Sequence, residues 1–174
     1  MQILIAPNAF KHALNATEVA TSIQRGLQAS RLRCTTVCFP IGDGGDGTGG
    51  LIIDRCNGAI VQTEVRDPLG RMVPAHFGLI EDGRTAVIEM ADASGLHLLQ
   101  PDELDPLRAN SFGTGELILK ALDSGATAIM IGVGGSATVD GGSGILAALG
   151  VRFLDHQGSR DYGFSVWIAA FANH

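Results

Sequence analysis

The sequence predicts an α/β protein in which a parallel sheet with helix crossovers is followed by a smaller mixed-sheet subdomain. The chain opens with two short apolar runs that flank an amphipathic helical segment, which is typical of a βαβ unit. Three β-rich runs then follow one another between residues 59 and 90 with no helical segment between them. The length of 174 residues is sufficient for a domain with a sizeable core.

Composition and charge restrict the class of protein. The apolar fraction is 45% and the charged fraction 17%, which is typical of a globular chain rather than a disordered or fibrous one. The formal net charge is −6 and the chain has no run of Lys or Arg, so we expect no nucleic-acid partner.

Cysteine usage and hydropathy predict a cytoplasmic protein with no membrane partner. The three cysteines are an odd number without a C-x-x-C pair, so a disulfide framework is not expected. No stretch approaches the roughly 20 apolar residues of a membrane span. The apolar start of the chain lacks a basic leader and is interrupted by Pro7, which predicts a buried strand rather than a signal peptide.

The first βαβ unit is expected at the start of the chain. Residues 2–6 and residues 35–39 are apolar runs, and each is followed directly by a proline. Between them Asn15 is a suitable N-cap, and Glu18 stands three residues later, which is the spacing of a capping box. The apolar face of the helix is expected to carry Val19, Ile23 and Leu27.

The middle of the chain is expected to form an antiparallel or mixed sheet. A short helix over Leu51, Ile52 and Ile53 is predicted to end near Gly58. Strands are then predicted at residues 59–65, 72–80 and 84–90. The turns between them are Asp67-Pro68-Leu69-Gly70 and Asp82-Gly83.

Later elements alternate again between helix and strand. Thr114 is a suitable cap for a helix that stops at Gly125. A strand is expected at residues 128–133, a helix at residues 145–149 and one more strand at residues 151–154. We accordingly divide the chain into residues 1–58, residues 59–158 with a glycine-rich loop, and an atypical, aromatic-rich tail at residues 159–174.

Half of the 24 glycines lie in two segments, residues 42–50 and residues 132–144. Glycine weakens regular structure, but a backbone without Cβ can bring its N–H groups against phosphate oxygens, especially before a helix N-terminus. The second segment also carries hydroxyl and carboxylate side chains that a simple turn does not require. We expect it to cradle phosphates, and the candidate residues are Gly134, Gly135, Ser136, Thr138, Gly141 and Gly142.

Three further side chains are candidates for phosphate chemistry. Asp43 and Asp46 flank two glycines on a flexible loop, an arrangement suited to Mg²⁺ with retained waters; the alternative is an exposed acidic turn. Lys11 follows the first strand and is able to neutralise charge on a transferring phosphoryl group, unless it is an ordinary surface lysine. Glu89 and Asp92 form another polar cluster after a strand.

The glycine-rich loop also allows a different function. The chain has no G-x-x-x-x-G-K-[ST] segment, which excludes a P-loop nucleotide site. Gly132, Gly134 and Ala137 do satisfy G-x-G-x-x-G/A after a strand, with Asp155 near the position of a ribose-binding acid, which predicts an NAD-dependent oxidoreductase. Against this alternative, the glycines at 141, 142 and 144 would weaken a helix that starts at Ala137.

Taken together, the segments resemble the glycerate kinase family. They occur in the family's order and cover nearly all of residues 1 to 158. The resemblance rests on IAPNAFKHAL (5–14), PIGDGGDGT (40–48), VRDPLGRMVPAHFG (65–78), AVIEMADASGL (86–96), SFGTGELI (111–118) and IGVGGSATVDGGSGILAALGVRFLD (131–155). The chain departs from the expected pattern at Asn8, Ala9 and His12, and at Asp46, where a glutamate is expected.

The resemblance implies a two-domain α/β kinase with a Rossmann-like domain, truncated here relative to the family. It implies transfer of the γ-phosphoryl group of ATP to glycerate with Mg²⁺, and 2-phosphoglycerate as the expected product. In this interpretation Asp43 and Asp46 assist Mg²⁺, Lys11 stabilises charge and Asp140 receives the proton of the substrate hydroxyl. A third alternative is a non-catalytic fragment, because a half-length chain would leave sheet edges and apolar faces uncovered.

Overall fold

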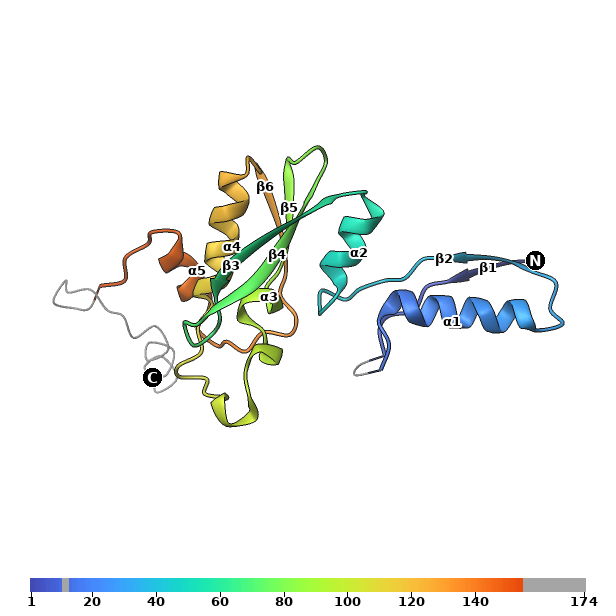
Figure 1. The fold of residues 1–174 in the computed structure, drawn as a ribbon, viewed down its shortest axis with the longest axis horizontal. Coiled ribbons are helices and arrows are strands. Elements are labelled where there is room, and N and C mark those ends of the chain that lie inside the picture. Colours follow the sequence, from blue (N-terminus) through green and yellow to red (C-terminus); the bar gives the residue numbers. More distant parts are fainter. Residues whose placement is uncertain (11–12, 155–174) are drawn as a thin grey trace.

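The computed structural model describes residues 1–10 and 13–154. Figure 1 shows two packed parts. The first part, drawn in blue, extends sideways from a larger body that contains the rest of the described chain. We call the first part the N-terminal layer, and it comprises residues 1–10 and 13–41.

The N-terminal layer is the predicted βαβ unit. Strands β1 (Gln2–Ile5) and β2 (Thr35–Cys38) are parallel and paired over their whole length. The crossover helix α1 (Ala16–Ala29) begins with the predicted capping box, since Asn15 Oδ1 accepts from the amide of Glu18 at 2.9 Å and Glu18 Oε2 accepts from the amide of Asn15 at 2.8 Å. These reciprocal bonds satisfy two N–H groups at the helix start, which confirms the predicted N-terminus.

The body contains a four-stranded mixed sheet. Its strands are β3 (Ala59–Arg66), β4 (Met72–Ile80), β5 (Thr85–Glu89) and β6 (Ala128–Gly132), in that spatial order. The pairs β3–β4 and β4–β5 are antiparallel, and the pair β5–β6 is parallel. The sequence prediction of a mixed sheet in this part of the chain is therefore confirmed.

Helices cover the sheet of the body. They are α2 (Thr48–Arg55), α3 (Ala91–Ser94), α4 (Phe112–Asp123) and α5 (Ser143–Ala148), with 3₁₀ turns η1 (Leu96–Leu98) and η2 (Pro101–Glu103). The main core lies between α4 and the strands. Its fully buried side chains include Val65, Phe77, Ile88 and Leu117. Within the described part of the chain, no helix is both long and apolar enough to cross a lipid bilayer.

Two predicted elements differ from the structure. Helix α4 begins at Phe112, so Thr114 is not its cap; Thr114 is buried in the helix and its hydroxyl lies 2.8 Å from that of Ser94. Residues 151–154 form no strand: Gly150 follows the end of α5 with φ of 94°, and only Leu154 makes a single β-bridge. The predicted tail at residues 159–174 lies outside the described residues.

Gly113 is packed so closely that a larger residue does not fit. A Cβ atom at this position would lie 1.7 Å from the carbonyl oxygen of Arg66, which belongs to β3 and cannot move aside as a side chain can. The helix propensity of glycine is poor, so its presence in the first turn of α4 is explained by this contact between helix and strand. Gly115 likewise approaches α5, where a Cβ would lie 2.6 Å from Cβ of Ala148.

We predict that Gly113→Ala lowers the free energy of unfolding by at least about 2 kcal/mol, a value typical of overpacking in a core. Gly26→Ala is the matched control, since Gly26 lies in α1 with no atom within 4 Å of the added methyl group. The control is expected to be neutral or to stabilise by up to about 1 kcal/mol through helix propensity. Urea unfolding of both variants measures the difference, and equal effects would contradict the close packing.

Candidate functional site

The two glycine-rich segments meet in space. The amide of Gly134 donates to the carbonyl oxygen of Gly44 at 2.8 Å, which joins the loop after β6 to the loop before α2. A Cβ on Gly134 would lie 2.4 Å from Cα of Gly45, so the two backbones touch directly. Each segment was predicted to lie between a strand and a helix, and the structure brings the two into direct contact.

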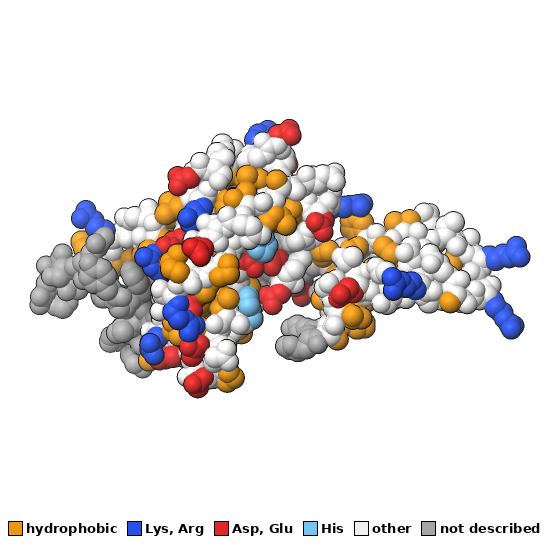
Figure 2. Space-filling view, viewed as in Figure 1, with side chains coloured by type: hydrophobic (Ala, Val, Ile, Leu, Met, Phe, Trp, Pro, Cys, Tyr) orange, Lys and Arg blue, Asp and Glu red, His pale blue; other side chains and the backbone are white. Residues whose placement is uncertain are grey.

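A cleft of about 840 Å³ lies beside this junction. On one side it is lined by the segment that connects β1 to α1, and on the other by the two glycine-rich loops and η1. The predicted residues Asp43, Asp46, Gly134 and Gly135 all line it. Figure 2 shows acidic and histidine side chains gathered where the body faces the N-terminal layer. The cleft is therefore shared between the two parts of the molecule.

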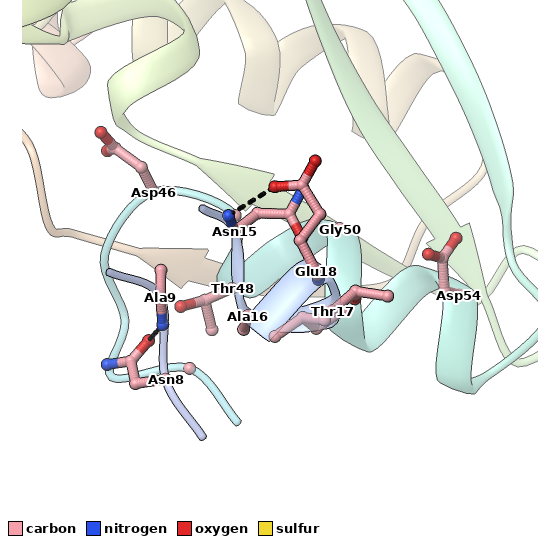
Figure 3. A pocket seen from close by; sticks show the side chains of 13 residues that line it. Asn8, Ala9, Asn15, Ala16, Thr17, Glu18, Asp46, Thr48, Gly50 and Asp54 are labelled. Atoms are coloured by element: carbon pink, nitrogen blue, oxygen red, sulfur yellow. Dashed lines mark hydrogen bonds between the residues drawn. The ribbon is translucent and has the colours of Figure 1, made fainter. Parts of the chain in front are cut away.

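A second hollow of about 410 Å³ lies next to the cleft, between the starts of α1 and α2. Its lining includes Glu18, Thr48 and Asp54, and it shares Asn15 and Asp46 with the larger cleft. Figure 3 shows the carboxylate of Asp46 directed away from Asp54 and Glu18. A Cβ on Gly135 would lie 2.3 Å from Asp46 Oδ1, so this carboxylate lies against the glycine-rich loop.

Glu89 fixes the loop before α2. Its Oε2 accepts from the amide of Gly47 at 3.0 Å, and its Oε1 accepts from the amide of Gly49. A carboxylate at a helix N-terminus satisfies free N–H groups and interacts favourably with the helix dipole. The N-terminus of α2 is thus occupied by the protein itself. The sequence predicted only that Glu89 belongs to a polar cluster after a strand; its position at the end of β5 was the signal for a role at the helix N-terminus.

Asp140 organises the second glycine-rich loop. It is buried, and its carboxylate accepts four hydrogen bonds. The amide and the hydroxyl of Ser111 donate to Oδ2 at 2.8 Å each, the amide of Gly144 donates to Oδ2 at 3.1 Å, and the amide of Gly142 donates to Oδ1 at 3.1 Å. Asp140 therefore ties the loop to the start of α4.

The other predicted phosphate residues occupy two places. The Ser136 and Thr138 hydroxyls lie 2.9 Å apart, and the amide of Thr138 donates to Ser136 Oγ at 3.1 Å. Gly141 and Gly142 belong to the turn around Asp140, with φ of 61° and 80°, and neither lines the cleft. Lys11 lies outside the described residues, although the cleft lining includes both Phe10 and Ala13.

Asp92 and His76 lie in contact close to the cleft and form an ion pair when His76 is protonated. The distance from His76 Nδ1 to Asp92 Oδ2 is 3.2 Å. Burial raises the pKa of the Asp92 carboxyl above its ordinary value of 3.8, and His76 acts in the opposite direction. The neighbouring carboxylates of Glu89 and Asp46 raise this pKa further, whereas His97 lowers it. These five side chains come from five different segments, so the fold concentrates ionisable groups at this point.

The loop after β6 does not have the geometry of a dinucleotide-binding turn. That fingerprint requires a helix to open at its third position, which would be Ala137 here. Instead the amide of Ala137 donates to the carbonyl oxygen of Ser94 at 2.8 Å, and α5 begins only at Ser143. The predicted alternative of an NAD site is therefore not favoured, because the helix that it requires does not begin at Ala137. Asp155, the proposed ribose ligand, lies outside the described residues.

The described residues supply only part of the ligand set that a divalent cation needs. They contain no group of three or more His, Cys, Asp or Glu side chains arranged for a metal ion. Mg²⁺ in phosphoryl-transfer sites is commonly held by one or two carboxylates together with waters and the phosphates of the substrate. Asp43 and Asp46 at the cleft fit that pattern, which requires a phosphate ligand to complete it.

Comparison with known proteins agrees with this arrangement. The profile of the Glycerate kinase family matches residues 3–164. A glycerate kinase from Bacillus subtilis is 51% identical over 159 residues, which is 91% of this chain and 42% of the relative. The glycerate 2-kinase of Escherichia coli is 48% identical over 164 residues, or 94% of this chain and 43% of the relative.

A solved structure shares both sequence and fold. A Salmonella typhimurium protein solved as a candidate glycerate kinase 2 is 48% identical, with a TM-score of 0.77. The similarity covers 92% of this chain and 43% of the Salmonella chain. The present chain therefore spans less than half the length of the relatives that it matches.

We predict that Asp140→Asn destabilises the protein by about 1 to 3 kcal/mol, because an amide nitrogen replaces one acceptor oxygen and faces buried donors. Urea unfolding of the variant measures the loss. The matched control is Asp105→Asn, since Asp105 Oδ1 accepts from the amide of Leu107 at 2.9 Å in an exposed turn. The control is expected to lose less than about 1 kcal/mol, and an equal loss in both variants would contradict a special role for Asp140.

We predict that the unfolding free energy of Asp92→Asn, relative to that of the parent chain, is higher at neutral pH than at acid pH. A carboxyl with a raised pKa contributes stability that is present below its unfolded pKa and is lost as the pH rises through its folded pKa. Asparagine removes that loss. The unfolding free energies of variant and parent, compared from about pH 3 to about pH 7, should shift in favour of the variant as the pH rises. A shift in the opposite direction would show that the ion pair with His76 outweighs burial.

Proposed function

The chain belongs to the glycerate kinase family, and on this basis we propose that it forms part of a site that transfers the γ-phosphoryl group of ATP to glycerate. The observation that carries this proposal is the junction of two glycine-rich loops beside two carboxylates in one cleft. Phosphoryl transfer depends mainly on positioning and electrostatic stabilisation, and backbone N–H groups with a bound cation supply both.

The geometry supports Gly135 as a phosphate-binding residue of the cleft, with Gly134 in the role of holding the loop in place. In the hydrogen-bond network of the described residues, the amide of Gly134 is used by Gly44, whereas the amide of Gly135 has no protein acceptor. Gly135 has φ of 71°, a conformation that favours glycine. We propose that Ser136 and Thr138 add hydroxyl donors, and that Gly141 and Gly142 act indirectly by shaping the loop around Asp140.

We propose Mg²⁺ as the accompanying cation, held by Asp43 and Asp46 through oxygen atoms or waters. When bound, the ion would neutralise charge on the phosphates of ATP. The proposed role of Lys11 is to stabilise charge on the transferred group. Both roles agree with the cleft, which brings the two carboxylates and the segment on either side of Lys11 to the same opening.

The contacts of Asp140 favour a positioning role over the predicted role as general base. A carboxylate offers about four lone-pair sites, and four protein donors already contact this one. A substrate hydroxyl would have to displace one of them. We therefore propose that Asp140 holds the loop, and its predicted role as base is dropped if Asp140→Asn retains turnover in a full-length family member.

We propose glycerate as the small-molecule substrate and 2-phosphoglycerate as the product. The Escherichia coli relative carries the name glycerate 2-kinase and is 48% identical, which supports phosphorylation at that position. A cytoplasmic location and the absence of a nucleic-acid partner stay predictions from composition. The competing proposal is a non-catalytic fragment. It is supported by the length of the match, which covers 42% of the Bacillus subtilis relative.

Calorimetric titration of the 174-residue chain with ATP and Mg²⁺ tests the proposed site, with NAD as the control ligand. We expect binding of ATP and not of NAD. Gly135→Ala should weaken ATP binding at least about tenfold, because the added methyl group strains the backbone and collides with Asp46. Gly70→Ala is the matched control, since Gly70 has φ of 89° in an open turn outside the cleft.

The control variant is expected to lose about 1 to 2 kcal/mol of stability from the same kind of backbone strain while binding ATP normally. Binding of NAD by the parent chain would contradict the kinase proposal. A folded parent chain that binds neither nucleotide would support the fragment alternative, and equal ATP binding by both glycine variants would remove Gly135 from the site.

A further inference from the structure

The cleft has apolar walls that the proposed phosphate chemistry does not use. Three large apolar side chains line it and remain exposed: Phe10 by 59%, Leu96 by 50% and Leu14 by 39%. Phe10 and Leu14 belong to the segment between β1 and α1, whereas Leu96 belongs to η1 of the body. We call these three residues the apolar walls. Single exposed apolar residues are common on protein surfaces, but three that line one cleft from two sides indicate a ligand.

The wall on the N-terminal layer is held by backbone hydrogen bonds. The amide of Phe10 donates to the carbonyl oxygen of Leu14 at 2.9 Å, and the amide of Leu14 donates to that of Phe10 at 3.1 Å. Two residues that exchange both bonds are direct partners in an antiparallel bridge, and their side chains lie on the same side of it. Phe10 and Leu14 therefore present one apolar surface to the cleft.

The wall on the body is joined directly to the second glycine-rich loop. The amide of Leu96 donates to the carbonyl oxygen of Gly135 at 2.9 Å. One residue earlier, Gly95 forms an antiparallel bridge with Ser136. These contacts on successive residues fix the start of η1 against the loop. The side chain of Leu96 and the proposed phosphate-binding residue Gly135 therefore belong to one fixed unit.

The composition of the cleft is suited to a ligand with two unlike ends. Asp43, Asp46 and Gly135 line it together with the apolar walls. Sites for small molecules and cofactors are lined mainly by apolar and aromatic side chains, and a few polar groups orient the ligand. The volume of about 840 Å³ falls within the roughly 300–1,000 Å³ of such sites. A ligand that fits this cleft carries a charged group and a large apolar group.

Of the two proposed substrates, ATP alone has an apolar group of this kind. Glycerate carries a carboxylate and two hydroxyls on a short carbon chain, so contact with the apolar walls would cost these groups their hydration. The adenine ring has two flat faces, which stack on aromatic and apolar side chains. We propose that the apolar walls bind the nucleobase of ATP, with Phe10 as its stacking partner; this inference rests on the proposed function.

This assignment divides the nucleotide between the two parts of the molecule. Phe10 and Leu14 belong to the N-terminal layer, whereas Leu96 and Gly135 belong to the body. A base held between the walls contacts both parts at once. Binding of ATP then favours one orientation of the N-terminal layer relative to the body, because only that orientation brings both walls against the same ring.

Calorimetric titration with three ligands separates the base from the phosphates. The purified 174-residue chain is titrated in the presence of Mg²⁺ with ATP, with inorganic triphosphate and with adenosine. We expect ATP to bind at least about tenfold more tightly than triphosphate, because triphosphate has no ring to stack on Phe10.

Side-chain variants locate the base. Phe10→Ala should remove most of the preference for ATP and leave the binding of triphosphate unchanged, whereas Phe10→Trp keeps an aromatic face and should retain the preference. Leu96→Ala should reduce the preference by a smaller factor. Phe10 is exposed by 59%, so its truncation leaves the core intact. Phe39→Ala is the matched control, since Phe39 is exposed by 42% and does not line the cleft.

The possible outcomes distinguish this inference from the proposed function. Equal affinity of the parent chain for ATP and triphosphate would overturn the inference and leave the phosphate site in place. So would a Phe10→Ala variant that behaves like Phe39→Ala, or one that loses triphosphate as well as ATP. Binding of adenosine that Phe10→Ala abolishes, without binding of triphosphate, would support the base site and contradict the phosphate site. A parent chain that binds none of the three ligands would overturn both proposals.

Discussion

The contact between the two glycine-rich loops fixes the side of the cleft that belongs to the body. It joins Gly134 to Gly44, which are far apart in the sequence, through a hydrogen bond of 2.8 Å and direct backbone contact. A side chain at Gly134 would force the loops apart, because its Cβ would lie 2.4 Å from Cα of Gly45. Glu89 strengthens the same junction, because it holds the amides of Gly47 and Gly49 at the start of α2. The carboxylates of the cleft are therefore presented by a backbone that is fixed from two sides.

Electrostatics explain why this fixed backbone is needed. The cleft is lined by Asp43 and Asp46, so a phosphate ligand meets negative charge there. Arg66 and Arg71 of the body are already engaged, the first with Glu116 and the second with Asp67 and Glu103. No Lys or Arg is among the described residues that line the cleft, so an anion there would be held by backbone N–H groups or by a divalent cation. This charge pattern agrees with the proposed ligand, which is the complex of ATP with Mg²⁺.

Local patterns predicted much of the fold, whereas contacts between distant residues escaped prediction. Asn15 and Glu18 are three residues apart, and the residues of the strand at 72–80 are contiguous. Both elements could therefore be predicted from a few neighbouring residues. Thr114 has the chemistry of a cap, but its burial against Ser94 could not be inferred from its neighbours. The bonds from Glu89 to α2 and from Asp140 to Ser111 likewise depend on how separate segments meet.

The N-terminal layer and the cleft are physically connected. Phe39 and Ile41 lead directly into the loop that carries Asp43 and Asp46, and the amide of Ile41 donates to the carbonyl oxygen of Pro7 at 3.0 Å. The cleft lies between the N-terminal layer and the body, so its width follows from the orientation of that layer.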